Sequence, residues 1–134
     1  MATVFSRIIK GEIPSCKVYE DEKFYAFLDI NPMSKGHTLL IPKTETDYIY
    51  DLDDNTISEM FVVSKKIAKA IKKVIPCKRV GIMVLGMEVP HAHIHLIPIN
   101  KESDMNLSNK RIQIAQEELK NIAEEIKSNL PETL

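Results

Sequence analysis

Residues 89–99, VPHAHIHLIPI, hold three of the four histidines of the chain, at every second position of an otherwise apolar run. A β-strand places alternate side chains on one face, so His91, His93 and His95 are expected to line one face together. At a rise of about 3.3 Å per residue, neighbouring histidines are about 7 Å apart at Cα. The stretch therefore predicts a strand with ionisable rings on one face and core residues on the other: Ala92, Ile94 and Leu96.

The composition is that of an ordinary globular protein. The chain has 134 residues, 44% of them hydrophobic and 28% charged, and a formal net charge of −1. These values fit one domain and offer no overall basic field for a nucleic acid. No apolar run of about 18 residues or signal peptide is present, which argues against a membrane partner. Cys16 and Cys77 form no CxxC pair, so we expect a cytoplasmic protein without disulfides.

The remaining segments predict an α+β fold around an antiparallel sheet of about five strands. Residues 17–30 read as two strands joined at 20–23, HTLLIP (37–42) as a third, VGIMVL (80–85) as a buried fourth, and the histidine run as the fifth. Thr3 can cap a short N-terminal amphipathic turn.

Two helices are predicted from apolar residues at intervals of three and four. The central helix spans 54–75, with Thr56 and Glu59 as a capping box. Lysines at helical spacing within 65–73 favour a solvated helix face. A last helix follows the polar loop 100–109. The apolar stripes of the two helices comprise Ile57, Met60, Phe61, Ile67, Ala68, Ile71 and Val74, and then Ile112, Ala115, Leu119, Ile122 and Ile126.

Three kinds of site use several histidines. Zinc binds imidazole at about 2.0–2.1 Å, but three rings on one strand converge with difficulty, and no carboxylate or cysteine is near in sequence. Buried structural histidines, or a pH switch, would bury several groups that titrate near neutrality. Catalysis at phosphorus suits the pattern best, because a neutral imidazole is a nucleophile at pH 7 and its neighbours can contact phosphate oxygens. We therefore expect no metal and no cofactor.

Residues 91–97, HAHIHLI, resemble the signature of the histidine triad (HIT) family of nucleotide hydrolases and transferases. The resemblance covers about residues 3–99, includes FSRIIKGEIP, EDEKFYAFLDINP and GHTLLIPK, and is strongest to bacterial and phosphoramidase-like members. It implies one HIT-like domain over 1–134, with a core at about 3–99 and a C-terminal helix and tail at 100–134. It also implies a homodimer.

The resemblance implies four catalytic residues. His93 is the nucleophile that attacks the α-phosphorus, with its tautomer fixed by a hydrogen bond to the backbone carbonyl of His91. His95 contacts phosphate oxygens and assists the leaving group, and His37 orients His95 or its partners. Water then releases a nucleoside monophosphate.

The resemblance also implies a purine nucleotide ligand such as AMP. Asp29 would accept hydrogen bonds from the ribose hydroxyls, although without the resemblance it is equally a turn former before Asn-Pro. The positions that would enclose the base, which composition alone would assign to the core, are Phe5, Ile8, Phe27, Ile30 and Leu39.

The segment after Gly86 departs from the family pattern. Phosphoramidase-like members place Gln and then Ser or Thr there, whereas this chain has Met87 and Glu88. A thioether donates no hydrogen bond, and an ionised carboxylate repels a phosphate. Gly86, Met87 and Glu88 are all expected to contact substrate. Losing one hydrogen-bond donor can cost about 2.7–4 kcal/mol of transition-state stabilisation. Activity on standard substrates is therefore expected to be weak, or the leaving group to differ.

The sequence thus predicts a nucleotide hydrolase that acts at the α-phosphorus of an adenylate, for example a nucleoside phosphoramidate, through a covalent nucleotidyl-histidine. Two alternatives stay open: a dinucleoside polyphosphate hydrolase, and a nucleotide-binding or sensing protein with weak or no catalysis.

Overall fold

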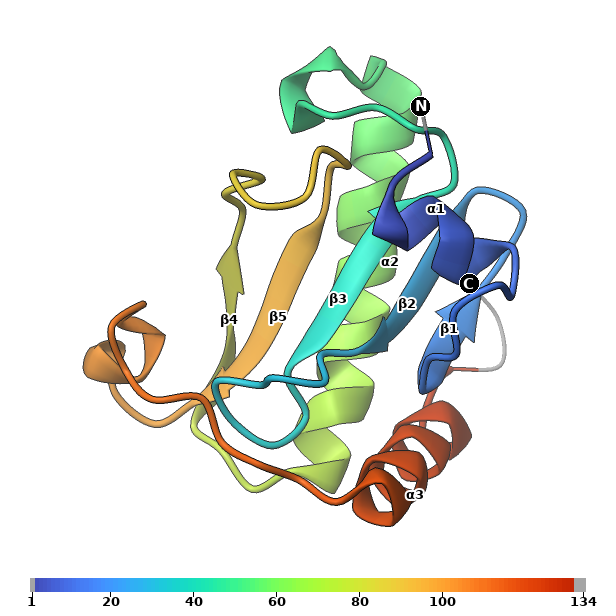
Figure 1. Ribbon diagram of the computed structural model, residues 1–134. Coiled ribbons are helices and arrows are strands. Elements are labelled where there is room, and N and C mark those ends of the chain that lie inside the picture. Colours follow the sequence, from blue (N-terminus) through green and yellow to red (C-terminus); the bar gives the residue numbers. More distant parts are fainter. Residues whose placement is uncertain (1, 132–134) are drawn as a thin grey trace.

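A five-stranded sheet forms the centre of the computed structural model, which describes residues 2–131. Every neighbouring pair of strands is antiparallel, and the order across the sheet is β1-β2-β3-β5-β4 (Figure 1). The α+β fold with five strands is therefore confirmed. The strands are β1 (Lys17–Glu20), β2 (Phe24–Leu28), β3 (Thr38–Pro42), β4 (Arg79–Met83) and β5 (Ile94–Ile99).

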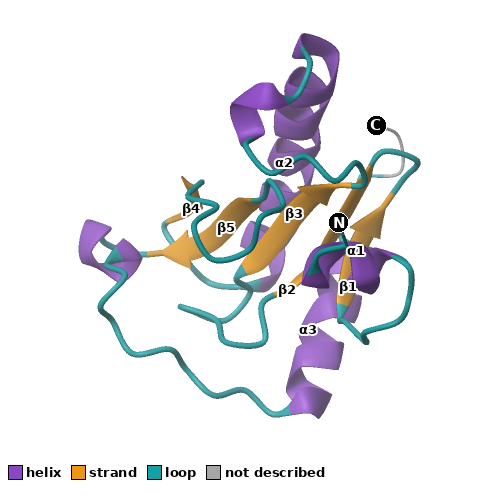
Figure 2. Ribbon diagram, turned by 45° about the horizontal axis from the view of Figure 1, so that its top comes forward, coloured by secondary structure: helices purple, strands orange, loops and turns teal. Residues whose placement is uncertain are grey.

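Helices cover both faces of this sheet (Figure 1 and Figure 2). The long helix α2 (Asp54–Val74) and the C-terminal helix α3 (Gln116–Ser128) lie on one face, and the short helix α1 (Val4–Ile9) lies on the other. Two short 3-10 turns, η1 (Ile49–Asp51) and η2 (Glu102–Met105), precede α2 and follow β5. Among the described residues, no helix combines the length and apolar character that crossing a membrane requires.

The alternation of side chains along β2 divides the core into two clusters. Phe24, Ala26 and Leu28 face the larger cluster under α2 and α3. Tyr25 and Phe27 face the smaller cluster under α1. This division is the period of two that a strand imposes on its side chains. Asp29, directly after β2, lies beside His37, with Oδ2 3.6 Å from Nε2.

The predicted buried strand at 80–85 is wrong in two respects. It ends at Met83, and it is an edge strand that pairs with β5 alone and leaves Ile82 53% exposed. A continuous apolar run indicates burial on both faces, but it does not show whether the burying surface belongs to the same chain.

The helix ends also differ from their prediction. Asp53 caps α2, because its Oδ1 accepts a hydrogen bond of 2.7 Å from the backbone N–H of Thr56, so the capping box of Thr56 and Glu59 is wrong. Phe61, predicted in the apolar stripe, is 41% exposed. The last helix begins only at Gln116, after an irregular segment that follows η2.

Candidate active site

The three histidines of the sequence motif do not share one strand. β5 begins at Ile94, so His91 and His93 lie in the irregular segment before it, and only His95 belongs to the strand. The predicted row of three rings on one pleated face is therefore wrong. The rings of His93 and His95 still lie side by side, with centroids 4.9 Å apart.

The local backbone fixes the tautomer of His93. Its Nδ1 lies 2.6 Å from the backbone oxygen of His91. Because a carbonyl only accepts, Nδ1 must carry the hydrogen, which leaves a lone pair on Nε2. This is the contact that the family resemblance implied. The ring of Phe5 meets His93 edge-on at 5.0 Å, and burial lowers the pKa of His93 below its ordinary value.

A second chain of hydrogen bonds fixes His37 and His95. The backbone N–H of Met33 donates to Nδ1 of His37 over 3.0 Å, so the neutral ring carries its hydrogen on Nε2. That Nε2 lies 3.0 Å from Nδ1 of His95 and donates to it, which places the His95 hydrogen on Nε2. Burial, with the neighbouring His95, lowers the pKa of His37 to about 3, and burial lowers that of His95 to about 4. Both rings are therefore neutral at neutral pH.

His91 is a buried structural partner rather than a wall of any cleft. Its Nε2 donates to the backbone oxygen of Pro42 over 2.8 Å, and its Nδ1 accepts from the hydroxyl of Thr3 over 3.0 Å. Thr3 also caps α1 by accepting from the backbone N–H of Ser6. His91 therefore ties the N-terminal helix, which carries Phe5, to the histidine segment.

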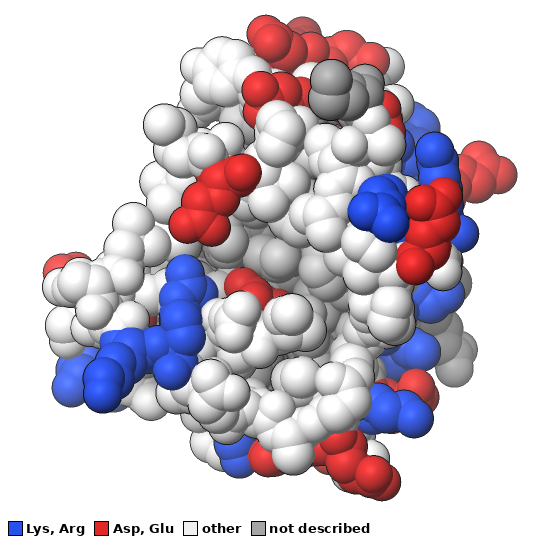
Figure 3. Space-filling model, in the orientation of Figure 1, with Lys and Arg blue, Asp and Glu red and all other residues white. Residues whose placement is uncertain are grey.

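A cleft of about 660 Å³ opens beside His93 and His95, within the range of small-molecule sites. Figure 3 shows the hollow in this face, with mainly uncharged atoms inside it and acidic and basic atoms meeting on its left side. Nine residues predicted from the sequence line the cleft: Phe5, Asp29, Ile30, Leu39, Gly86, Met87, Glu88, His93 and His95.

Four of the predicted site residues do not line this cleft. Ile8 on α1 and Phe27 on β2 are buried in the smaller core cluster, where Phe27 packs against Phe5 with ring centroids 5.6 Å apart. His37 and His91 are buried behind the residues that they hydrogen-bond. They can act on a ligand in the cleft only by positioning other groups.

Seven residues of the cleft wall were not predicted. Most adjoin predicted ones, but Leu107 comes from the predicted polar loop 100–109. Arg111 comes from the start of the predicted last helix, where the structure has an irregular segment instead. A polar loop gives no signal of what it lies against. The seven are Val4, Asn31, Met83, Leu85, Val89, Leu107 and Arg111.

Asp29 directly follows β2 and lines the cleft. Its Oδ1 accepts from the backbone N–H of Asn31 over 2.8 Å, and its Oδ2 lies 3.6 Å from Nε2 of His37. Burial raises its pKa, which that hydrogen bond and the nearby Arg111 partly oppose. Since His37 is neutral, the approach of these two groups is not an ion pair.

Asp29, His37 and His95 also offer ligand atoms that all lie within 4.8 Å of one another, and they form the one such group among residues 2–131. A metal would need unprotonated nitrogens on both rings. Because Met33 places the hydrogen of His37 on Nε2, metal binding would have to break the hydrogen bond between the two histidines. The absence of a metal stays a prediction.

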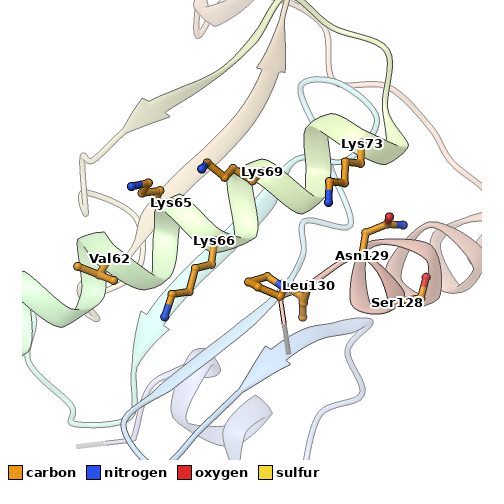
Figure 4. A pocket seen from close by; sticks show the side chains of 9 residues that line it. Val62, Lys65, Lys66, Lys69, Lys73, Ser128, Asn129 and Leu130 are labelled. Carbon is orange, nitrogen blue, oxygen red and sulfur yellow. The ribbon is translucent and has the colours of Figure 1, made fainter. Parts of the chain in front are cut away.

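A separate groove of about 500 Å³ lies between α2 and the end of α3 (Figure 4). None of the described residues that line it is a histidine or a carboxylate, so it lacks the imidazole groups that the cleft beside His93 offers. It is lined by Val62, Lys65, Lys66, Lys69, Lys73, Ser128, Asn129, Leu130 and Pro131.

Comparison with known proteins decides the family. The model of the HIT domain matches residues 10–102, more than half of the chain. The chain belongs to the HIT family. A HIT-like protein of Borreliella burgdorferi is 36% identical over 135 residues, covering 95% of this chain and 97% of its own. Adenosine 5′-monophosphoramidase of Schizosaccharomyces pombe is 35% identical over 136 residues, with 97% and 99% covered.

A solved structure supports the same assignment. The crystal structure of a HIT-like protein from Bartonella henselae, described as involved in cell-cycle regulation and holding an unknown ligand, is 34% identical, has a TM-score of 0.82 and covers 96% of each chain. The resemblance drawn from residues 91–97 is thereby confirmed. The family match ends at residue 102, so it does not include Leu107, Arg111 or α3.

Proposed function

We propose that this HIT protein is a nucleotide hydrolase that acts at the α-phosphorus of an adenylate, with His93 as the nucleophile. The observation that carries the proposal is the tautomer of His93, whose Nδ1–H is held by the His91 carbonyl at 2.6 Å while Nε2 keeps its lone pair beside a cleft of about 660 Å³. The phosphoramidase name of the fission yeast relative supports the reaction class.

In the first step the Nε2 lone pair of His93 forms a bond to phosphorus, and the bond from phosphorus to the leaving group breaks. The leaving group departs with the electron pair of that bond and takes up a proton from solvent water as the bond breaks. The hydrogen bond to the His91 carbonyl stabilises the positive charge that develops on the imidazole. In the second step water displaces His93. Over both steps one water is consumed: its hydroxyl goes to phosphorus and a proton goes to the leaving group.

His95 acts in this proposal as a neutral hydrogen-bond donor. A doubly protonated His95 would set its Nδ1–H against the Nε2–H of His37, which Met33 holds in place. We therefore assign to His95 the contact between its Nε2–H and a phosphate oxygen, and to His37 the positioning of that donor. The leaving-group role implied by the resemblance is limited to this hydrogen bond, and the proton itself comes from water.

Nucleotide recognition follows from the cleft wall. Phe5 and Leu39 offer apolar surface to a purine, and Asp29 offers a carboxylate to the ribose hydroxyls. A second cavity of about 350 Å³ adjoins the cleft and shares four lining residues with it: Leu85, Gly86, Met87 and His93. The two linings together contain one cation, which suits a single phosphate better than a polyphosphate chain. This favours a phosphoramidate over a dinucleoside polyphosphate.

The test is turnover of adenosine 5′-phosphoramidate and of a dinucleoside polyphosphate, with AMP binding measured on the same preparation. The proposal expects the higher kcat/KM on the phosphoramidate and loss of turnover to background in His93→Ala. Binding of AMP without turnover of either substrate would instead support a nucleotide sensor. The reverse order of kcat/KM would support the polyphosphate hydrolase.

We also propose a homodimer of single-domain protomers in the cytoplasm. β4 is an edge strand, and apolar side chains are exposed on it and on α2: Ile82 at 53%, Val62 at 53% and Phe61 at 41%. An open strand edge beside apolar surface is a typical docking face. Sedimentation equilibrium should show a dimer that Ile82→Asp dissociates, whereas Ile30→Asp, on the loop after β2, should leave it intact. A monomeric wild-type chain would contradict this.

A further inference from the structure

The segment between η2 and α3 crosses the loop that follows β2. In Figure 1 it runs from η2 below the sheet toward α3 and passes beside that loop. The backbone N–H of Ile112 donates to the oxygen of Pro32 over 3.0 Å, and Lys35 forms an ion pair of 2.6 Å with Glu118. A part of the chain beyond the matched family domain is thus fixed against the loop that carries Asp29.

Arg111 enters the cleft from this segment. Its Nη1 donates to the backbone oxygen of Asn31 over 3.0 Å and lies 4.0 Å from Oδ2 of Asp29. Nε and Nη2 have no hydrogen-bond partner within the described part of the chain, and the side chain is 37% exposed. A guanidinium has five N–H donors, so most of them stay available to a ligand in the cleft.

The charges of the cleft wall make Arg111 important for binding an anion. Asp29 and Glu88 are carboxylates, and His93 and His95 are neutral at neutral pH. Among the described residues that line the cleft, Arg111 is the single cation. A nucleotide phosphate brings at least one negative charge, which two carboxylates repel and a guanidinium attracts. Without Arg111 the cleft would oppose the binding of its proposed ligand.

We propose that Arg111 is a substrate-binding residue that contacts an anionic oxygen of the nucleotide, while Asp29 accepts the ribose hydroxyls beside it. The inference rests on the proposed function and deepens it, because it makes the phosphate charge a requirement for binding. Arginine binds phosphate with charge-assisted hydrogen bonds. The cleft therefore selects nucleotides over uncharged nucleosides through a residue outside the matched domain.

The test compares AMP with adenosine, which differ in the phosphate. Calorimetric titration of both ligands into the full chain is expected to show at least about ten-fold weaker AMP binding in Arg111→Gln, with adenosine binding changed less than about two-fold. Arg111→Lys should recover part of the AMP affinity. Lys110→Gln removes the same charge from the neighbouring exposed residue and should leave both affinities unchanged.

Each other outcome overturns the inference. Equal losses for AMP and adenosine would show that Arg111 only holds the loop through Asn31. An unchanged AMP affinity, or an equal loss in Lys110→Gln, would show that Arg111 makes no specific contact with the phosphate. The proposed function fails separately: a wild-type chain that binds AMP through Arg111 but turns over no nucleotide would refute the hydrolase and keep the Arg111 site.

Discussion

Nε2 of His37 donates to Nδ1 of His95 over 3.0 Å, and the backbone N–H of Met33 decides which ring is the donor. His37 is 1% exposed, and it lines no part of the cleft. In the proposed mechanism, His37 is therefore a positioning residue, which presents the His95 hydrogen to the substrate.

His37→Asn is expected to lower kcat and leave KM for the nucleotide within about three-fold, because the base and ribose contacts are unchanged. His95→Asn should have a similar effect, and the double variant should lose little more, since the two rings act as one unit. Additive losses in the double variant would show that they act independently. Steady-state kinetics of the four proteins provides the measurement.

The depressed pKa of His37, about 3, also predicts acid sensitivity. An unfolded histidine titrates near 6.5, so between pH 6.5 and about 3 the unfolded state binds more protons and stability falls as pH falls. Titration of His37 alone changes the free energy of unfolding by roughly 1.4 kcal/mol per pH unit in this range. In urea unfolding between pH 7 and 4.5, the free energy of unfolding should fall more steeply with pH in the wild type than in the His37→Asn variant. Parallel curves would contradict the buried neutral assignment.

The motif at 91–97 predicted the family, and the resemblance implied most of the cleft wall, because the matching motifs are local patterns in the sequence. The sequence did not predict where β5 begins. Two of the motif histidines leave the strand to bond with backbone oxygens, and a period of two cannot show such hydrogen bonds. Arg111 lay beyond prediction because its role depends on where a polar segment passes, which no periodicity records. The exposure of β4 likewise depends on which elements cover it, and an apolar run does not record this.

Thr3 links the helix cap to the site through His91, so its hydroxyl serves two purposes. Thr3→Val should cost roughly 1–2 kcal/mol of stability from the lost cap, and it should lower kcat as Phe5 and His93 lose their fixed placement. Thr3→Ser keeps the hydroxyl and should restore most of both properties. Urea denaturation and kinetics measure the two effects. A Thr3→Ser variant as impaired as Thr3→Val would contradict the role of the hydroxyl, because serine keeps it.

The loop at 86–88 is expected to limit the rate. Met87 is 89% exposed and offers no hydrogen-bond donor to the substrate. The double variant Met87→Gln with Glu88→Ser should raise kcat/KM on adenosine 5′-phosphoramidate by roughly 100-fold, the scale of one transition-state donor. The matched control, Met87→Leu with Glu88→Ala, removes the charge without supplying any hydrogen-bond donor and should give a smaller gain. Equal gains would assign the limitation to the Glu88 charge alone.

The pH dependence of kcat/KM should report the nucleophile. Protonation removes the Nε2 lone pair, and the pKa of His93 is lowered, mainly by burial. Activity should therefore hold as pH falls to 6.5 and decline only below it. A midpoint above 6.5 would show that another group controls the acid limb.

The central claim is that phosphorus becomes bonded to Nε2 of His93. Rapid base quenching of the chain mixed with an α-³²P-labelled adenosine phosphoramidate, followed by peptide mapping without acid steps because acid cleaves the P–N bond, tests it directly. The proposed mechanism predicts that label on His93 forms and decays within one turnover. The label should be absent from His93→Ala and present in Arg111→Gln at saturating substrate. Label on any other residue, or turnover without a labelled protein at any quench time, would contradict it.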